Sequence, residues 1–155
     1  MYKLLAIVSL LSVTGCAATY KEPITAQPDA SQNIQGSQVK LLRAAKQVLV
    51  SEGYQITNID DAAGLISTAP KDIRLTPKMA DCGTTMGLDY LKDNRTSSKL
   101  GYGVLASDNK ITLKANMSAT YLPGNDTQSI TLTCVSRGHL ENELLAKIQS
   151  IMTSY

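Results

Sequence analysis

The sequence contains no Phe, no Trp and a single His among its 155 residues. Its formal net charge is only +2, with the two signs mixed along the chain, so it lacks the clustered basic face that nucleic-acid binding needs. One histidine, His139, and no close group of Cys and His leave little with which to build a zinc site. No G-x-S-x-G pattern is present. We therefore expect no cofactor, no metal, no nucleic-acid partner and no enzymatic activity.

The chain is nevertheless rich enough in apolar residues to fold. Hydrophobic residues make up 43% of it, which supports a core. A length of 155 residues fits one compact domain with extensions and argues against two domains. The sequence shows no internal repeat.

The amino terminus has the layout of a secretory signal. Lys3 supplies a positive charge, and residues 4–13 form an apolar run of about ten residues, half of what a membrane-spanning helix needs. The run ends in Val13-Thr14-Gly15-Cys16, which resembles the lipobox of bacterial lipoproteins. The alternative is a chance Gly-Cys pair behind an ordinary secretion signal.

The lipobox resemblance implies that Cys16 is acylated and becomes the mature amino terminus, so that acyl chains anchor the protein to a membrane. Ala17 in the next position resembles the sorting signal for the outer membrane, where we expect the domain on the periplasmic face. We expect residues 1–15 to be the signal peptide and residues 16–37, with Pro, Gly, Ser and Gln but no apolar period, to be the lipidated terminus and a flexible tether. Residues 38–155 are then a single globular domain.

After Ser37, a suitable N-cap, apolar residues recur at helical spacing and predict a helix over 38–52, with Gly53 as the stop signal directly behind it. Its apolar side should lie on a core and its basic side in solvent. Residues 54–59 and 65–69 read as the two strands of a hairpin that closes before Pro70.

The carboxy-terminal half has the clearest pattern. Every second residue from Ile111 to Tyr121 is apolar and the residues between are polar, which predicts a long half-buried strand. A strand around Tyr102 precedes it, a strand with Cys134 facing inward follows it, and a helix from about Gly138 closes the chain. We expect an α+β domain with an antiparallel sheet of about five strands and two helices on one face, in the order helix, hairpin, long loop, three-strand meander, helix.

Two cysteines remain after Cys16, namely Cys82 and Cys134. A cysteine pair in an exported protein is most simply a structural disulfide, which would attach the long loop to the core side of the sheet. The alternative is a redox pair, although no C-x-x-C spacing supports it.

The long segment over residues 70–99 is the most prominent candidate for recognition. It has six basic and four acidic side chains and no sustained period, and a loop of that length is either partly ordered or functional. Residues 86–91 within it could form a short helix or a strand. Tyr and Arg are enriched at protein interfaces. The candidate partner-binding residues are Arg74, Tyr90, Arg95 and Lys99. The alternative is a solvated loop without a partner.

A further resemblance rests on Gly53-Tyr54-Gln55-Ile56-Thr57 and Gly64-Leu65-Ile66-Ser67-Thr68. With the preceding helix, these segments resemble small bacterial lipoproteins and, more distantly, the helix-grip domains of the lipoprotein designated C in the outer-membrane β-barrel assembly machine. The Cys82 loop departs from that pattern, so no assembly function carries over.

Three functions are consistent with these features. The first is a lipid-anchored, non-catalytic module that binds another envelope protein. The second is a carrier of a small ligand or lipid, with a groove between sheet and helices. The third is an inhibitor of an envelope-active enzyme.

Overall fold

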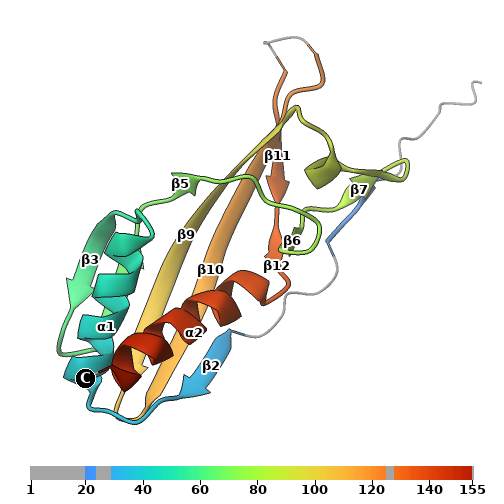
Figure 1. The fold of residues 1–155 in the computed structure, drawn as a ribbon. Helices are drawn as coiled ribbons and strands as arrows, with labels where there is room; N and C mark the ends of the chain where they lie inside the picture. The colour runs from blue at the N-terminus through green and yellow to red at the C-terminus, as the bar shows by residue number, and fades with distance from the viewer. Residues whose placement is uncertain (1–19, 24–28, 125–127, 155) are drawn as a thin grey trace, which may run out of the picture.

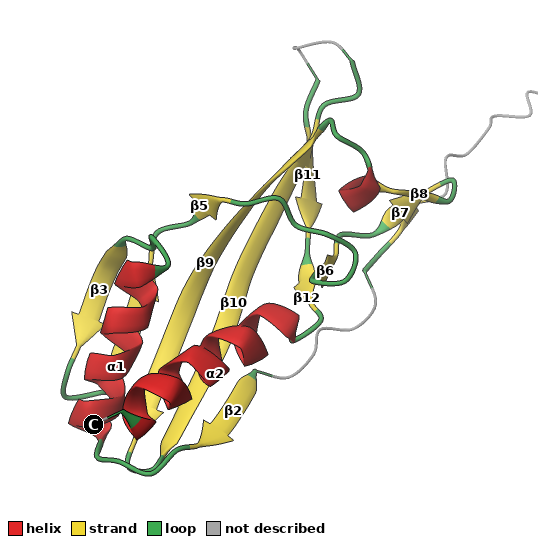
Figure 2. Ribbon diagram, in the orientation of Figure 1, coloured by secondary structure: helices red, strands yellow, loops and turns green. Residues whose placement is uncertain are grey.

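The fold is that of a computed structural model, which describes residues 20–23, 29–124 and 128–154 (Figure 1). The expected signal peptide and the lipidation site at Cys16 lie outside the described residues. The expected α+β class is confirmed: two helices lie over one face of an antiparallel sheet (Figure 2).

The centre of the sheet is one long hairpin. β9 (Thr96–Ser107) and β10 (Lys110–Tyr121) are antiparallel and pair over their whole length, from Ser107 opposite Lys110 to Thr96 opposite Tyr121. Between them Asn109 adopts a positive φ of 60°, which Asn tolerates better than most residues. The predicted alternation over residues 111–121 is confirmed, because the apolar side chains of β10 are buried or half-buried and the polar ones between them are more exposed.

Further strands extend this hairpin on both sides. On the β9 side lie β4 (Leu65–Thr68), β3 (Ile56–Asp60) and the short β5 (Lys71–Asp72). On the β10 side lie β2 (Ala30–Asn33), opposite the start of β10, and β11 (Ile130–Thr133), opposite its end. This sheet has seven strands, so the expected count of about five is not the observed one.

The expected tether over residues 16–37 is therefore partly wrong. β2 belongs to the main sheet, and Ile34 directly after it is buried in the core. β1 (Tyr20–Lys21) pairs with β7 (Thr84–Thr85). Neither strand has an apolar pattern, because each is held at a sheet edge by backbone hydrogen bonds rather than by buried side chains.

The two helices form the second layer. α1 (Gln38–Ser51) starts after Ser37 and is followed by Gly53 at a φ of +76°, as predicted, although the Ser37 side chain forms no capping hydrogen bond. α2 (His139–Thr153) packs beside α1 over the sheet. Both helices bury their apolar sides against β9 and β10; the fully buried side chains include Leu41, Leu49, Leu100, Leu113 and Ile148.

The segment expected as a loop over 70–99 is largely folded into short elements. β6 (Ala80–Asp81) pairs with β12 (Val135–Ser136), and β7 pairs with β8 (Leu88–Asp89), which leads into the 3₁₀ helix η1 (Tyr90–Lys92). β9 already begins at Thr96, so the predicted end of the loop was four residues too late.

A disulfide between Cys82 and Cys134 joins this segment to the sheet, as predicted. Cys82 is buried, and the pairing of β6 with β12 runs beside the bond. The two cysteines are 52 residues apart in the sequence. Cys134 and Leu132 face inward as expected, but Ile130, expected beside them, is 43% exposed at the outer end of the edge strand β11.

The first prediction concerns this disulfide. A Cys82→Ser/Cys134→Ser variant should lose up to about 4 kcal/mol of unfolding free energy, because a closed loop of this length restricts the unfolded chain. Urea unfolding of the oxidised protein, the reduced protein and the double variant measures this. Equal midpoints for the oxidised and reduced proteins would contradict a stabilising bond.

Candidate functional site

The four candidate residues of the long segment do not form one exposed surface. Tyr90 is only 5% exposed: its ring packs edge-on against Tyr121, and its hydroxyl is 2.6 Å from the Thr85 hydroxyl oxygen. As a partner contact Tyr90 was therefore a wrong prediction. The sequence could not show this, because the burial of Tyr90 depends on a ring that lies 31 residues further along the chain.

The two candidate arginines share one acidic neighbour. Arg95 forms an ion pair with the Asp93 carboxylate at 2.6 Å, to which its Nη2 and Nε donate, and its Nη1 donates to the Pro123 carbonyl. Arg74 donates to the carbonyl oxygens of Asp93 and Thr96. The hydrogen bonds from Arg95 lower the pKa of Asp93 to about 2. Both guanidinium groups thus hold the chain where β9 starts.

Lys99 is likewise engaged within the segment. Its ammonium lies 2.9 Å from the Asp72 carboxylate, across the pairing of β5 with β9. The excess of basic residues counted over 70–99 is therefore partly neutralised by acids of the same segment. This reduces the electrostatic case for a partner there.

A different surface, on the outer side of α1, combines exposed apolar groups with positive charge. Val39, Arg43, Lys46 and Val50 are spaced by four, three and four residues, which places them in one stripe along the helix. Val39 is 63% and Val50 62% exposed. We call these four residues together with Lys40 the α1 outer face.

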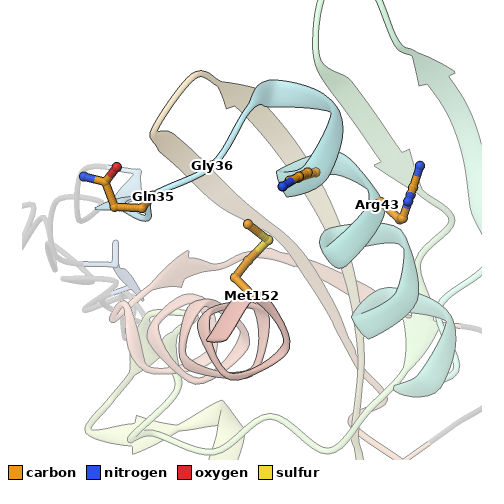
Figure 3. A pocket seen from close by; sticks show the side chains of 5 residues that line it. Gln35, Gly36, Arg43 and Met152 are labelled. Carbon is orange, nitrogen blue, oxygen red and sulfur yellow. The ribbon is translucent and has the colours of Figure 1, made fainter. Parts of the chain in front are cut away.

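Two hollows flank Arg43 on this face. One, of about 340 Å³, lies between the ends of the two helices and is lined by Gln35, Gly36, Lys40, Arg43 and Met152. Figure 3 shows Met152 rising from α2 between the Gln35–Gly36 segment and α1. The other, of about 400 Å³, lies on the far side of Arg43 and is lined by Val39, Leu42, Arg43, Lys46 and Asp61.

The charges on the α1 outer face are only partly compensated. Lys46 forms an ion pair with Asp61 at 2.8 Å. For Lys40 and Arg43, no acidic side chain within the described ranges comes within ion-pair distance. A surface with two unneutralised cations, exposed valines and hollows on both sides suits an acidic and partly apolar ligand.

A group of ionisable side chains lies where α2 meets Tyr54 and Tyr102. Tyr54 and Tyr102 contact each other edge-on with ring centroids 5.0 Å apart, and burial raises the pKa of both hydroxyls, which is opposite to activation at neutral pH. Lys147 lies between Glu52 and Glu143, and the hydrogen bonds to both hold its pKa above the usual value. Within residues 20–23, 29–124 and 128–154, no cluster of His, Cys, Asp and Glu could hold a metal ion.

One buried carboxylate was not singled out from the sequence. Glu141, in the first turn of α2, is 4% exposed. It accepts hydrogen bonds from the Ala115 amide and the Ser136 hydroxyl, and Ser136 in turn accepts one from the Gly138 amide. Glu141 thus joins the start of α2 to the part of the β10 edge that lies between β2 and β11, which is a structural role.

The α1 outer face was also missed, since its basic residues were interpreted as simply solvated. The signal available in the sequence was the position of Val39 and Val50, which fall on the basic side of the helix rather than on its core side. His139 lies half-buried at the start of α2.

Comparison with known proteins adds little. No family model matches the chain, and no curated protein matches its sequence. Among solved structures, the chain is similar to a TBP-like protein from Parabacteroides distasonis, with 16% sequence identity and a TM-score of 0.45. The match covers 67% of this chain and 62% of that one.

The ion pair at the start of β9 gives a prediction about pH. The Asp93 carboxylate should titrate near pH 2, and Arg95→Ala should move its pKa up towards 3.8, because the hydrogen bonds from Arg95 favour the charged form. Since the folded-state pKa lies below the unfolded value, any stability from this pair is present above about pH 4 and is lost as the pH falls towards 2.

NMR titration of the Asp93 carboxyl carbon measures this pKa. Arg74→Ala, which removes hydrogen bonds only to carbonyl oxygens, is the matched control and should leave the low pKa in place. An ordinary Asp93 pKa in the unsubstituted protein would show that the ion pair does not form.

Proposed function

We propose that the protein is a lipid-anchored protein of the outer membrane whose periplasmic domain is a non-catalytic module that binds another envelope protein. Three observations support this. Residues 1–16 resemble a lipoprotein signal with its lipobox. The disulfide between Cys82 and Cys134 suits an oxidising compartment such as the periplasm. Burial raises the pKa of the Tyr54 and Tyr102 hydroxyls, so neither is activated as a nucleophile at neutral pH.

The α1 outer face carries the proposal. It presents Lys40 and Arg43, which form no ion pair with an acidic side chain of the described residues, together with the exposed Val39 and Val50. Arg is among the residues that dominate binding energy at protein interfaces when a partner covers it. The partner we propose therefore presents acidic and apolar side chains to α1. The long segment around Arg74 and Arg95 is the weaker candidate, because both guanidinium groups are already hydrogen-bonded within the domain.

A small-ligand or lipid carrier is the second candidate, and one observation favours it. The hollow of about 340 Å³ between Gly36 and Met152 falls at the lower end of the usual range for ligand pockets and has two cations at its rim. A lipid that copurifies with the protein in native mass spectrometry, and is lost in an Arg43→Glu variant, would support this second function over the first.

The prediction for the α1 outer face uses a photocrosslinking amino acid placed at Val39 in living cells. We expect a discrete crosslinked species, and we expect Lys40→Glu/Arg43→Glu in the same chain to remove it, because the reversed charges repel an acidic partner. Immunoblotting detects the heavier species, and mass spectrometry identifies the partner.

As matched controls, the same photocrosslinking amino acid is placed at two exposed positions elsewhere. These are Arg95 and Leu105, and Leu105 lies on the uncovered face of the sheet. A crosslink from Arg95 but not from Val39 would move the interface to the long segment. A Val39 crosslink that persists after the charge reversal would contradict an acidic partner.

The anchor has its own test. Cys16→Ser should leave the protein unacylated and move it from the membrane fraction to the soluble fraction, because acyl chains supply the attachment. Intact-mass measurement of the unsubstituted protein should show a chain that starts at residue 16 and carries lipid. A membrane-bound chain with residues 1–15 still attached would contradict the lipobox assignment.

A further inference from the structure

The small sheet made of β1, β7 and β8 lies at the end of the molecule remote from α1 (Figure 2). It carries three exposed apolar side chains, which we call the apolar tip: Tyr20 is 45%, Met86 81% and Leu88 41% exposed. Tyr20 and Leu88 both lie opposite Thr85 in the three-stranded sheet, and Met86 directly follows β7.

The conformation of Met86 is unusual for its residue type. Met86 and Gly87 form the two-residue turn between β7 and β8, and both have positive φ, 51° and 80°. Such turns favour Asn, Asp or Gly, because other side chains are disfavoured at positive φ. A Met in the first position is strained by this conformation, and with 81% of its surface exposed it gains little from the core. The fold alone does not account for it.

The position of β1 brings the apolar tip close to the proposed anchor. β1 is fixed to β7, and this close approach depends on Gly83, where a Cβ would lie 2.7 Å from the Lys21 carbonyl oxygen. Tyr20 follows Cys16 by four residues, and four residues span at most about 14 Å. An acylated Cys16 would therefore hold this sheet within that distance of the bilayer surface.

We propose that the apolar tip contacts the lipid surface, with Met86 entering the interfacial region of the membrane. This inference rests on the proposed anchor at Cys16. Lys21 and Glu22 near the tip have opposite charges, so the contact depends on apolar burial and not on anionic lipid. Two attachments, the acyl chains and the tip, then orient the domain so that the α1 outer face points away from the membrane.

The absence of Trp from the natural sequence provides a direct test. Acylated full-length protein with Met86→Trp is placed in vesicles of zwitterionic phospholipid, with and without brominated chains. We expect the fluorescence to shift to shorter wavelength and to be quenched by the brominated lipid. The matched control is Val39→Trp, because Val39 is also well exposed, at 63%, but lies on α1; this variant should show neither change. Addition of anionic lipid should not alter the quenching of the Met86→Trp protein.

The outcomes separate this inference from the proposed anchor. A protein that carries no lipid and does not bind vesicles contradicts the anchor. An anchored protein with unquenched, solvent-like Met86→Trp fluorescence, or with quenching only in the presence of anionic lipid, overturns the proposed contact. Met86→Asn should fold at least as stably as the unsubstituted protein, since Asn tolerates positive φ; a loss of stability would show that Met86 serves the fold instead.

Discussion

The pairing of β9 with β10 is the interaction on which the rest of the structure depends. The two strands pair without interruption from the turn at Asn109 to Tyr121, and all other strands of the main sheet add to one side or the other of this hairpin. Its inner face supplies the apolar layer on which α1 and α2 pack. The disulfide and Glu141 then attach the irregular segment and the start of α2 to the β10 side of the hairpin.

The elements that could be predicted from the sequence are those held by buried side chains. The alternation from Ile111 to Tyr121 and the helical spacing of Leu41, Val48 and Leu49 arise from one-sided burial, which leaves a periodic pattern. β1 and β2 leave no such pattern, because their stability comes from backbone hydrogen bonds to strands far away in the sequence. The burial of Tyr90 could not be predicted for a related reason, since it requires Tyr121 from another strand.

For the candidate site, too, the local sequence was a poor guide wherever the outcome depends on residues from other elements. Counting charges over residues 70–99 indicated a basic surface, but the folded segment brings Asp72 to Lys99 and Asp93 to Arg95. On α1 the opposite error occurred, because the basic residues were interpreted as merely solvated. In the structure they lie with exposed valines beside two hollows. Met152 of α2 lines one hollow and Asp61, in the turn between β3 and β4, lines the other, so neither hollow could be predicted from the helix alone. Net charge is a property of composition, whereas unneutralised charge is a property of the fold.

The edge of β10 is covered by two strands from opposite parts of the chain, β2 near its start and β11 near its end. During synthesis, which starts at the amino terminus, β2 is made before β10 and β11 after it. The first part of β10 can therefore pair with β2 at once, whereas its last part has no neighbour on this edge until residue 133 has been made. A shortened chain that begins at residue 38 would leave the backbone of Lys110 to Leu113 bare. Bare strand edges recruit other chains, so the segment that resembles a dispensable linker also protects the domain from edge-to-edge aggregation.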